Sequence, residues 1–238
     1  TNGIFECLEK GAEYIHWDEK RKAYAEQTGD VRKGVGMALF SYKTGVWPIS
    51  LEIAGARLSL NQDGSVQLML GATEIGQGAD TVFSQMVAEV LHTDMAHVHI
   101  KTVQDTDVSP FDTGAYASRQ SFVTGTAVRH CAELLRDKIL AYAATLLPEV
   151  DAKELRLEDN WIWAGDEQAM SVAALAEESY YSLTNSSVLT AEVSEQVKKN
   201  TIATGCCFAE VEVDIKLGKI RILNIINVHD SGKLLNPQ

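Results

Sequence analysis

The chain has 238 residues, 45% of them hydrophobic, which is enough to bury the core of one large domain or two small ones. Its net charge of -12 argues against a nucleic-acid or anionic-membrane partner, because both require a basic surface. No segment approaches the roughly 20 apolar residues that cross a bilayer, and the start of the chain lacks a signal-peptide pattern. Four cysteines without a repeated spacing form no disulfide framework or zinc motif, so we expect a reducing, cytoplasmic environment.

In the first half of the chain, local patterns predict helices and a hairpin. The first thirty residues are polar, with apolar residues at helical spacing, and a strand-like pattern begins at Val35. Alternation of apolar and polar residues over 56–70, interrupted by turn residues, predicts a β-hairpin. Apolar residues recur with helical period over 83–91, which predicts an amphipathic helix, and a strand is expected over 98–103.

The second half repeats these patterns. Apolar residues over 128–139 predict a second, longer amphipathic helix, and residues 172–178 predict a short one. Strict alternation over 209–217, followed by a glycine turn and residues 220–222, predicts another hairpin. Strands that pair through hairpins, with helices between them, indicate an α+β fold with mixed sheets and two amphipathic helices. A sub-boundary is possible near 150–205.

The first candidate site is the loop over residues 71–81, between a predicted strand and the first amphipathic helix. Gly76 and Gly78 permit close approach of a ligand to the backbone and backbone angles that other residues avoid. The following helix start favours an anion, and Gln77 can both donate and accept hydrogen bonds at the edge of a heterocycle. An ordinary tight turn remains an alternative, since a lone GxG motif is weak.

The second candidate site is the loop over residues 112–121, which leads into the longer helix. Its small residues and hydroxyls suit a phosphate or pyrophosphate, and Arg119 adds a fixed fork of N–H donors. The alternative is that Ser118 or Ser121 only caps the helix and that Arg119 is a solvated charge. Two such loops in one chain favour a shared phosphorylated ligand.

Three segments together resemble one protein family. GATEIGQG at 71–78 resembles the GGTE(M/I)GQG segment of the large subunit of the xanthine dehydrogenase/aldehyde oxidase family. GAYASRQS at 114–121 is similar to the family's GxYxSRS-type segment, and the stretch from AEVEVD at 209–214 to NP at 236–237 is similar to a third. The matches occur in the family's order and span most of the chain, so jointly they are specific.

The resemblance implies the molybdopterin-binding portion of a molybdenum hydroxylase, such as a bacterial xanthine dehydrogenase. Such enzymes oxidise a purine, N-heterocycle or aldehyde with water as the oxygen source, and iron–sulfur and FAD groups lie on other domains or subunits. The SRQS form resembles bacterial members whose pterin carries a cytosine dinucleotide, which is the form we expect; Gln120 departs from the commoner Ser. The positions that the resemblance assigns to the cofactor are Ile75, Gly76, Gln77, Gly78, Thr81, Ala117, Ser118, Arg119, Gln120 and Ser121.

The resemblance also implies that parts of the active site lie elsewhere. The family's catalytic glutamate lies in a GxGE-like segment beyond Gln238, and its GGFGG-type loop and substrate arginine lie before Thr1. We therefore expect residues 1–238 to be an internal segment of the cofactor-binding domain, inactive alone, with no catalytic residue or metal ligand of its own. Glu74 is expected to be structural, and Trp47 to line the substrate pocket or the core. The alternative function is a non-catalytic α+β module that binds a nucleotide or docks a partner subunit.

Overall fold

The structure is a computed structural model that describes residues 3–101 and 104–236. The chain divides into two compact units. Residues 1–44 and 201–238, the two ends of the chain, belong to what we call the terminal unit, and residues 45–200 form the central unit. The terminal unit is therefore built from segments far apart in the sequence, whereas the central unit is one continuous stretch.

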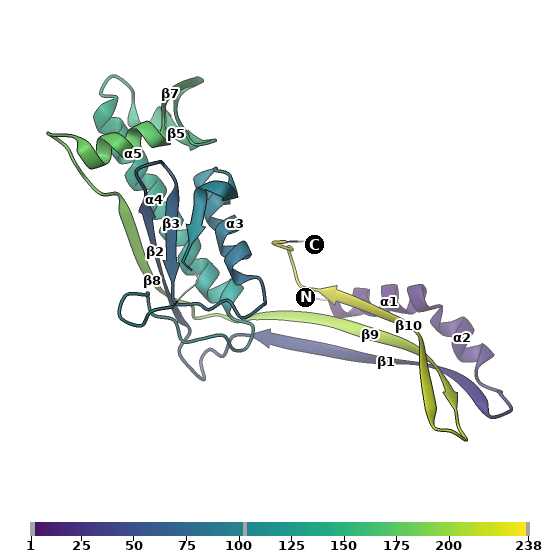
Figure 1. The fold of residues 1–238 in the computed structure, drawn as a ribbon. Helices are drawn as coiled ribbons and strands as arrows, with labels where there is room; N and C mark the ends of the chain where they lie inside the picture. The colour runs from purple at the N-terminus through teal and green to yellow at the C-terminus, as the bar shows by residue number, and fades with distance from the viewer. Residues whose placement is uncertain (1–2, 102–103, 237–238) are drawn as a thin grey trace. The chain divides into compact units, whose positions relative to one another are not determined.

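The terminal unit is a three-stranded antiparallel sheet with two helices (Figure 1). The strand order is β1-β9-β10. The hairpin predicted from residues 209–222 is confirmed, and its strands are longer than the alternating pattern alone indicated. The elements are α1 (Gly3–Ile15), α2 (Trp17–Ala23), β1 (Val31–Thr44), β9 (Thr201–Asp214) and β10 (Lys219–Asp230).

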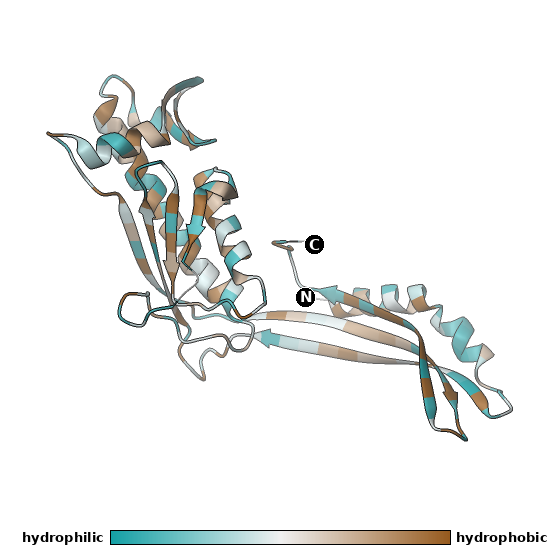
Figure 2. Ribbon diagram, viewed as in Figure 1, coloured by the Kyte–Doolittle hydropathy of each residue, from teal (hydrophilic) through white to brown (hydrophobic). Residues whose placement is uncertain are grey.

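A small apolar cluster holds α1 against this sheet. Cys206 and Phe208 of β9 are fully buried, and they pack with Cys7 and Ile15 of the helix. A side chain at Gly11 would collide with the Phe208 ring, so the helix approaches the strand through a glycine. Figure 2 shows brown apolar stretches among teal polar ones along the β9–β10 hairpin. Cys206, Phe208 and Glu210 share the buried face of β9, whereas the apolar residues of the predicted alternation, such as Val211 and Val213, lie on its other, half-buried face.

The central unit contains a four-stranded sheet of order β4-β3-β2-β8. The β3–β4 pair is parallel and the others are antiparallel. The first predicted hairpin is confirmed, as is the strand predicted after it, although Val103 lies outside the described residues. The strands are β2 (Ile53–Leu60), β3 (Val66–Leu70), β4 (Val98–Ile100) and β8 (Thr190–Gln196).

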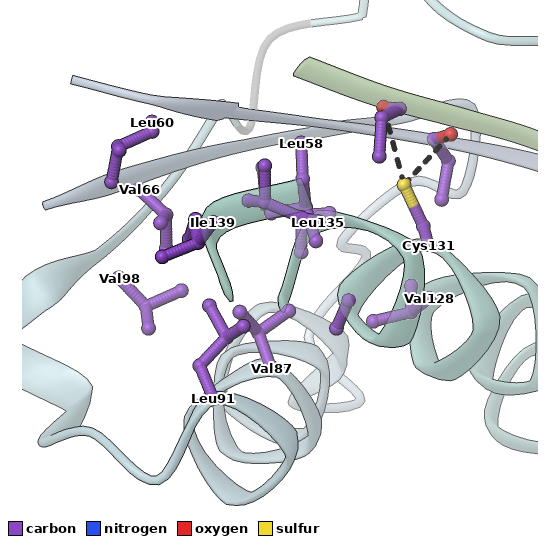
Figure 3. Packing of buried hydrophobic residues seen from close by; sticks show 14 of the residues in the cluster. Leu58, Leu60, Val66, Val87, Leu91, Val98, Val128, Cys131, Leu135 and Ile139 are labelled. Atoms are coloured by element: carbon purple, nitrogen blue, oxygen red, sulfur yellow. Dashed lines mark hydrogen bonds between the residues drawn. The ribbon is translucent and has the colours of Figure 1, made fainter. Parts of the chain in front are cut away.

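The two predicted amphipathic helices are α3 (Ala79–Leu91) and α4 (Gln120–Leu146), and both pack into the core of this sheet. In Figure 3, Leu58 of β2, Val87 of α3 and Leu135 of α4 point toward one another, and all three are completely buried. Where α4 meets the sheet, the buried Cys131 thiol donates to the carbonyls of Ala56 and Ala191 at 3.4 and 3.3 Å. Burial raises the pKa of this thiol to about 11, so it stays protonated.

The rest of the central unit is a small three-stranded sheet and one helix. The predicted helix at 172–178 is confirmed, but the sheet was not predicted from the sequence. Among the described residues, no helix has the length and apolar composition needed to cross a membrane. These elements are β5 (Leu155–Glu158), β6 (Trp161–Ala164), β7 (Glu167–Ser171), α5 (Val172–Tyr181) and the 3-10 turns Met95–His97 and Ala152–Glu154.

Candidate cofactor site

The two candidate loops, which lie far apart in the sequence, are joined by side-chain hydrogen bonds. We call residues 71–78 the glycine loop and residues 112–121 the arginine loop. The Gln77 amide donates to the Thr73 carbonyl at 3.0 Å and to the side-chain oxygen of Gln120. The Gln120 amide donates in turn to the same Thr73 carbonyl at 3.2 Å. The structure therefore brings together the loops that the sequence motifs had singled out.

The backbone of the glycine loop is open. Gly76 and Gly78 have φ angles of 100° and 83°, and a Cβ at either position would meet no atom within 4 Å. Glycine is therefore required by the backbone angle and not by crowding. Ile75 and Gln77 are exposed, as is Thr81 near the start of α3. The Gln77 side-chain oxygen accepts from the Ile75 N–H at 2.7 Å, which stiffens the loop from inside.

The start of α3 carries its own anion. The Glu74 carboxylate accepts from the N–H groups of Gly76 and Gly78 at 2.6 and 3.2 Å. Its other oxygen accepts from Asp80 N at 3.1 Å. Hydrogen bonds from these backbone donors, that of Asp80 above all, lower the pKa of Glu74 despite its partial desolvation. The structural role expected for Glu74 fits these contacts, whereas the external anion expected at this helix start would compete with the protein's own carboxylate.

The Arg119 side chain is completely buried between two carboxylates. Its Nε donates to Glu52 at 2.5 Å, and its Nη1 donates to Asp112 at 2.6 Å. Nη1 also reaches the Gly114 carbonyl at 3.0 Å, and Nη2 reaches the Ile53 carbonyl at 2.7 Å. Burial by itself lowers the pKa of Arg119, but the two carboxylates outweigh it and raise the pKa. We call Glu52, Asp112 and Arg119 the buried hub.

These contacts correct both sequence interpretations of Arg119. A guanidinium has about five N–H donors, and four hydrogen bonds join those of Arg119 to oxygen atoms of the protein. The side chain is therefore neither a fork directed at an external phosphate nor a solvated charge. Any contact of this position with a ligand must come through its backbone.

The carboxylates of the buried hub extend it into neighbouring segments. Asp112 accepts from the Gly114 N–H and from the Thr124 hydroxyl of α4, both at 2.8 Å. Glu52 accepts from the Val46 N–H at 2.5 Å. The hub thus ties the entry into the central unit, the arginine loop and the first turns of α4 to one another.

Two strained residues precede the hub arginine. Ala117 and Ser118 have φ angles of 47° and 51°, so consecutive non-glycine residues adopt the left-handed conformation. Each such residue costs on the order of 1–2 kcal/mol and persists where its surroundings hold it. One such restraint is the Gly45 N–H, which donates to the Ala117 carbonyl at 2.9 Å. Strain of this kind clusters at ligand clamps and active sites.

The start of α4 differs from the start of α3. Arg119 is the N-cap residue of α4, and its side chain makes no capping hydrogen bond. The first N–H groups of a helix lack intrahelical partners, and together with the helix dipole they favour an anion. Here those groups include the N–H groups of Gln120 and Ser121, and the Ser121 side chain is exposed. This helix start suits an external phosphate better than the start of α3.

Trp47 lies in the segment that leads from Gly45 to Glu52. It is half-buried, its peptide bond to Pro48 is cis, and its carbonyl accepts from the Asn200 side chain at 2.6 Å. Since neighbouring Val46 and Gly45 bond to the hub and to the arginine loop, Trp47 is held close to that loop in the fold. Its place in a substrate pocket stays a prediction.

Sequence reasoning missed two members of the buried hub. Glu52 received no role, and Asp112 was only the first letter of a loop motif. A weak signal existed for Glu52, because it is the one charged residue directly before a strand whose sequence, IAGARLSL, is largely apolar. Asp112 gives the sign of an Asx turn, since it stands two residues before Gly114.

Comparison with known proteins decides the family. Residues 10–238 match the family described as the molybdopterin cofactor-binding domain. The chain belongs to this family. It is 48% identical, over 99% of its length, to the xanthine dehydrogenase molybdenum-binding subunit of Escherichia coli O157:H7, and it covers 32% of that protein. The molybdopterin-binding domain spans about a third of the length of the relatives it matches.

Solved structures share the α+β fold of this molybdopterin-binding domain. Quinoline 2-oxidoreductase from Pseudomonas putida 86 matches with a TM-score of 0.83 at 22% identity, over 98% of this chain and 31% of that one. Carbon monoxide dehydrogenase from Oligotropha carboxidovorans matches with a TM-score of 0.82 at 22% identity, over 97% and 31% of the two chains. At these identities the likeness establishes the fold.

Proposed function

We propose that the glycine loop and the arginine loop together bind the molybdopterin cofactor of a molybdenum hydroxylase. The observation that carries this proposal is the pairing of Gln77 with Gln120, which joins the two loops that the family resemblance assigns to the cofactor. The open backbone at Gly76 and Gly78 and the uncapped start of α4 fit a ligand with a flat ring system and a phosphate. When bound, the cofactor supplies the redox chemistry of the reaction.

The contacts suggest a division of labour between the loops. The exposed residues Ile75, Gly76 and Gln77 contact the pterin, and the Gln77 side chain fixes the shape of their backbone. The N–H groups of Gln120 and Ser121 receive the phosphate. Under this proposal Gly78, Thr81, Ala117, Ser118 and Arg119 contribute through backbone geometry or, for Thr81 and Ser118, through an exposed hydroxyl.

For the whole enzyme we propose oxidation of a purine, N-heterocycle or aldehyde with water as the oxygen source, as in a bacterial xanthine dehydrogenase. The 48% identity to a xanthine dehydrogenase subunit supports this reading. Because that relative is a molybdenum-binding subunit, we also propose iron–sulfur and flavin partners. A cytoplasmic location is supported by four free cysteines, three of them buried.

The test of function is the cofactor content of the full-length protein. We expect about one molybdenum and one pterin per protein, whereas a nucleotide-binding or docking module would hold neither. The chain of 238 residues by itself should hold far less than one molybdenum and show no turnover, because binding requires many simultaneous contacts. Stoichiometric molybdenum in the isolated chain would contradict the expectation that part of the cofactor-binding site lies outside residues 1–238.

A second measurement identifies the form of the cofactor. We propose the cytosine dinucleotide, because the second loop has the SRQS sequence and an uncapped helix start that can receive a phosphate. Acid hydrolysis of the purified enzyme should release a cytosine nucleotide in an amount equal to the molybdenum, measured by chromatography. Release of the pterin monophosphate alone would reject this form and leave the binding proposal intact.

A further inference from the structure

The side chains of the buried hub bind one another and atoms of Val46, Ile53, Gly114 and Thr124, which lie in or beside the arginine loop. We propose that Glu52, Asp112 and Arg119 are positioning residues for the cofactor. They hold the strained turn at Ala117–Ser118 and thereby fix the direction of the N–H groups at the start of α4. This inference rests on the proposed function, since it concerns how that same site is shaped.

Arg119 is placed so that its side chain controls the backbone on both sides. Its N–H donates to the Tyr116 carbonyl at 3.1 Å, across the strained turn. Its own carbonyl accepts from Phe122 at 3.1 Å and from Val123 at 2.7 Å, which forms the first turn of α4. Four side-chain hydrogen bonds fix the residue that joins these two structures. A shift of the guanidinium therefore moves the turn and the helix start together.

The strained turn at Ala117–Ser118 requires restraints from its surroundings, and the buried hub supplies some of them. Left to itself, a non-glycine residue leaves the left-handed region, and two in a row favour another conformation by an amount that one backbone hydrogen bond does not offset. The restraints come from two directions: the Ala117 carbonyl is held by Gly45, and Arg119 is held by Glu52 and Asp112. Since Glu52 also binds Val46, the same carboxylate fixes both restraints.

The net charge of the buried hub allows a positioning role to be distinguished from electrostatic attraction of an anionic ligand. Two carboxylates face one guanidinium, so the ionised hub has one excess negative charge. If the site bound an anion through charge alone, removing a hub carboxylate would tighten binding. If the hub works by positioning, the same change loosens binding. The two roles thus predict effects of opposite sign.

Glu52→Gln in the full-length enzyme is the decisive variant. Glutamine keeps the size of Glu52 and can accept from Val46, but it then turns an N–H toward the Arg119 Nε. We expect cofactor occupancy to fall about tenfold, as for loss of a hydrogen bond to a charged group. Hydrogen exchange of residues 113–121 in the cofactor-free protein should become faster. Glu192→Gln, which breaks an exposed pair with Arg57, is the matched control and should change neither.

Kinetics distinguish positioning from general loss of structure. Turnover per bound molybdenum and the substrate KM should stay at wild-type values in Glu52→Gln, while turnover per protein falls with occupancy. Glu52→Asp, which retains a carboxylate, should recover part of the occupancy. If Glu52→Gln does not accumulate in folded form, Asp112→Asn replaces it, with the same expected loss of occupancy and faster exchange.

The outcomes separate this inference from the proposed function. Wild-type occupancy or tighter binding in Glu52→Gln, with unchanged exchange at residues 113–121, would overturn the positioning role and leave cofactor binding by the loops standing. A wild-type enzyme without any pterin would overturn both. Lower occupancy with faster exchange, absent from Glu192→Gln, supports the positioning role.

Discussion

The glycine loop and the arginine loop both lead into a helix, but the backbone angles and the helix start are stabilised differently in the two loops. In the glycine loop, Gly76 and Gly78 take the unusual backbone angles without strain, and Glu74 satisfies the helix start. In the arginine loop, Ala117 and Ser118 take such angles under strain, and no side chain of the N-cap residue caps the helix.

The difference teaches where an external anion can bind. A helix start whose N–H groups already bind a carboxylate of the protein offers little to a phosphate, whatever its sequence motif suggests. A helix start without such a carboxylate, held in place by a buried ion cluster, offers preorganised donors. The glycine loop therefore suits the uncharged part of a ligand, and the arginine loop suits its charged part.

The largest expected effect comes from replacing Arg119, which holds the arginine loop in place. Arg119→Met leaves Glu52 and Asp112 buried and unpaired, so the free energy of unfolding of the central unit should fall by about 3–5 kcal/mol. Urea denaturation followed by circular dichroism measures this change. Arg57→Met, which removes an exposed ion pair, should cost less than about 1 kcal/mol. Equal losses in the two variants would show that the buried hub has no special role.

A smaller effect is expected where the two loops meet. Gln77→Ala removes the hydrogen bonds to Thr73 and Gln120, so the loops should lose their common geometry. In the full-length subunit we expect cofactor occupancy or turnover to fall about tenfold or more, since two hydrogen bonds are lost and each contributes about 0.5–1.5 kcal/mol. The molybdenum content measures this directly.

A double-mutant cycle with Gln120→Ala sharpens the test of the contact between the loops. Residues in direct contact show coupling of about 0.5–3 kcal/mol, so the double variant should lose less than the sum of the single ones. Wild-type molybdenum content and turnover in Gln77→Ala would remove Gln77 from the site.

The stability that the glycine loop contributes should depend on pH. The folded-state pKa of Glu74 is lowered, so its stabilising effect is present above its unfolded pKa and is lost as pH falls through the folded pKa. Glu74→Gln should therefore be less stable than wild type near pH 7, and the difference should shrink below about pH 4. Denaturation midpoints across this range measure it, with Glu89→Gln, exposed on the same helix, as the control. A difference independent of pH would contradict the role of the charged carboxylate.

The local elements of the fold were predictable because their signals are local. The hairpin over residues 56–70 shows period-two alternation, and α3 and α4 show an apolar stripe at helical spacing. The strands β5, β6 and β7 were not predicted because WIWA of β6 and EQAMS of β7 lack period-two alternation, and LRLE of β5 alternates over only four residues. The partner of β1 also could not be read from the sequence, since any long alternating strand offers the same edge.

For the candidate site, the sequence identified the loops but not the roles within them. Glycines, a glutamine and a helix start are recognisable as motifs at a fixed spacing. The burial of Arg119 is not, because it depends on Glu52, which lies 67 positions away and reaches the loop only in the folded chain. The same holds for Glu74, whose carboxylate binds N–H groups that only a folded loop directs toward it.

The way the chain threads through its two units has a consequence for biosynthesis. Thr44, the last residue of β1, is the partner of Thr201, the first of β9. As the chain leaves the ribosome, the continuous central unit is complete before β9 and β10 exist. Once folded, the central unit keeps Gly45 beside Asn200, so the end of β1 and the start of β9 are close together. Most of the conformational entropy that closing this long loop requires has then already been lost. Until then, the 14-residue β1 has unpaired edges that can pair with another molecule.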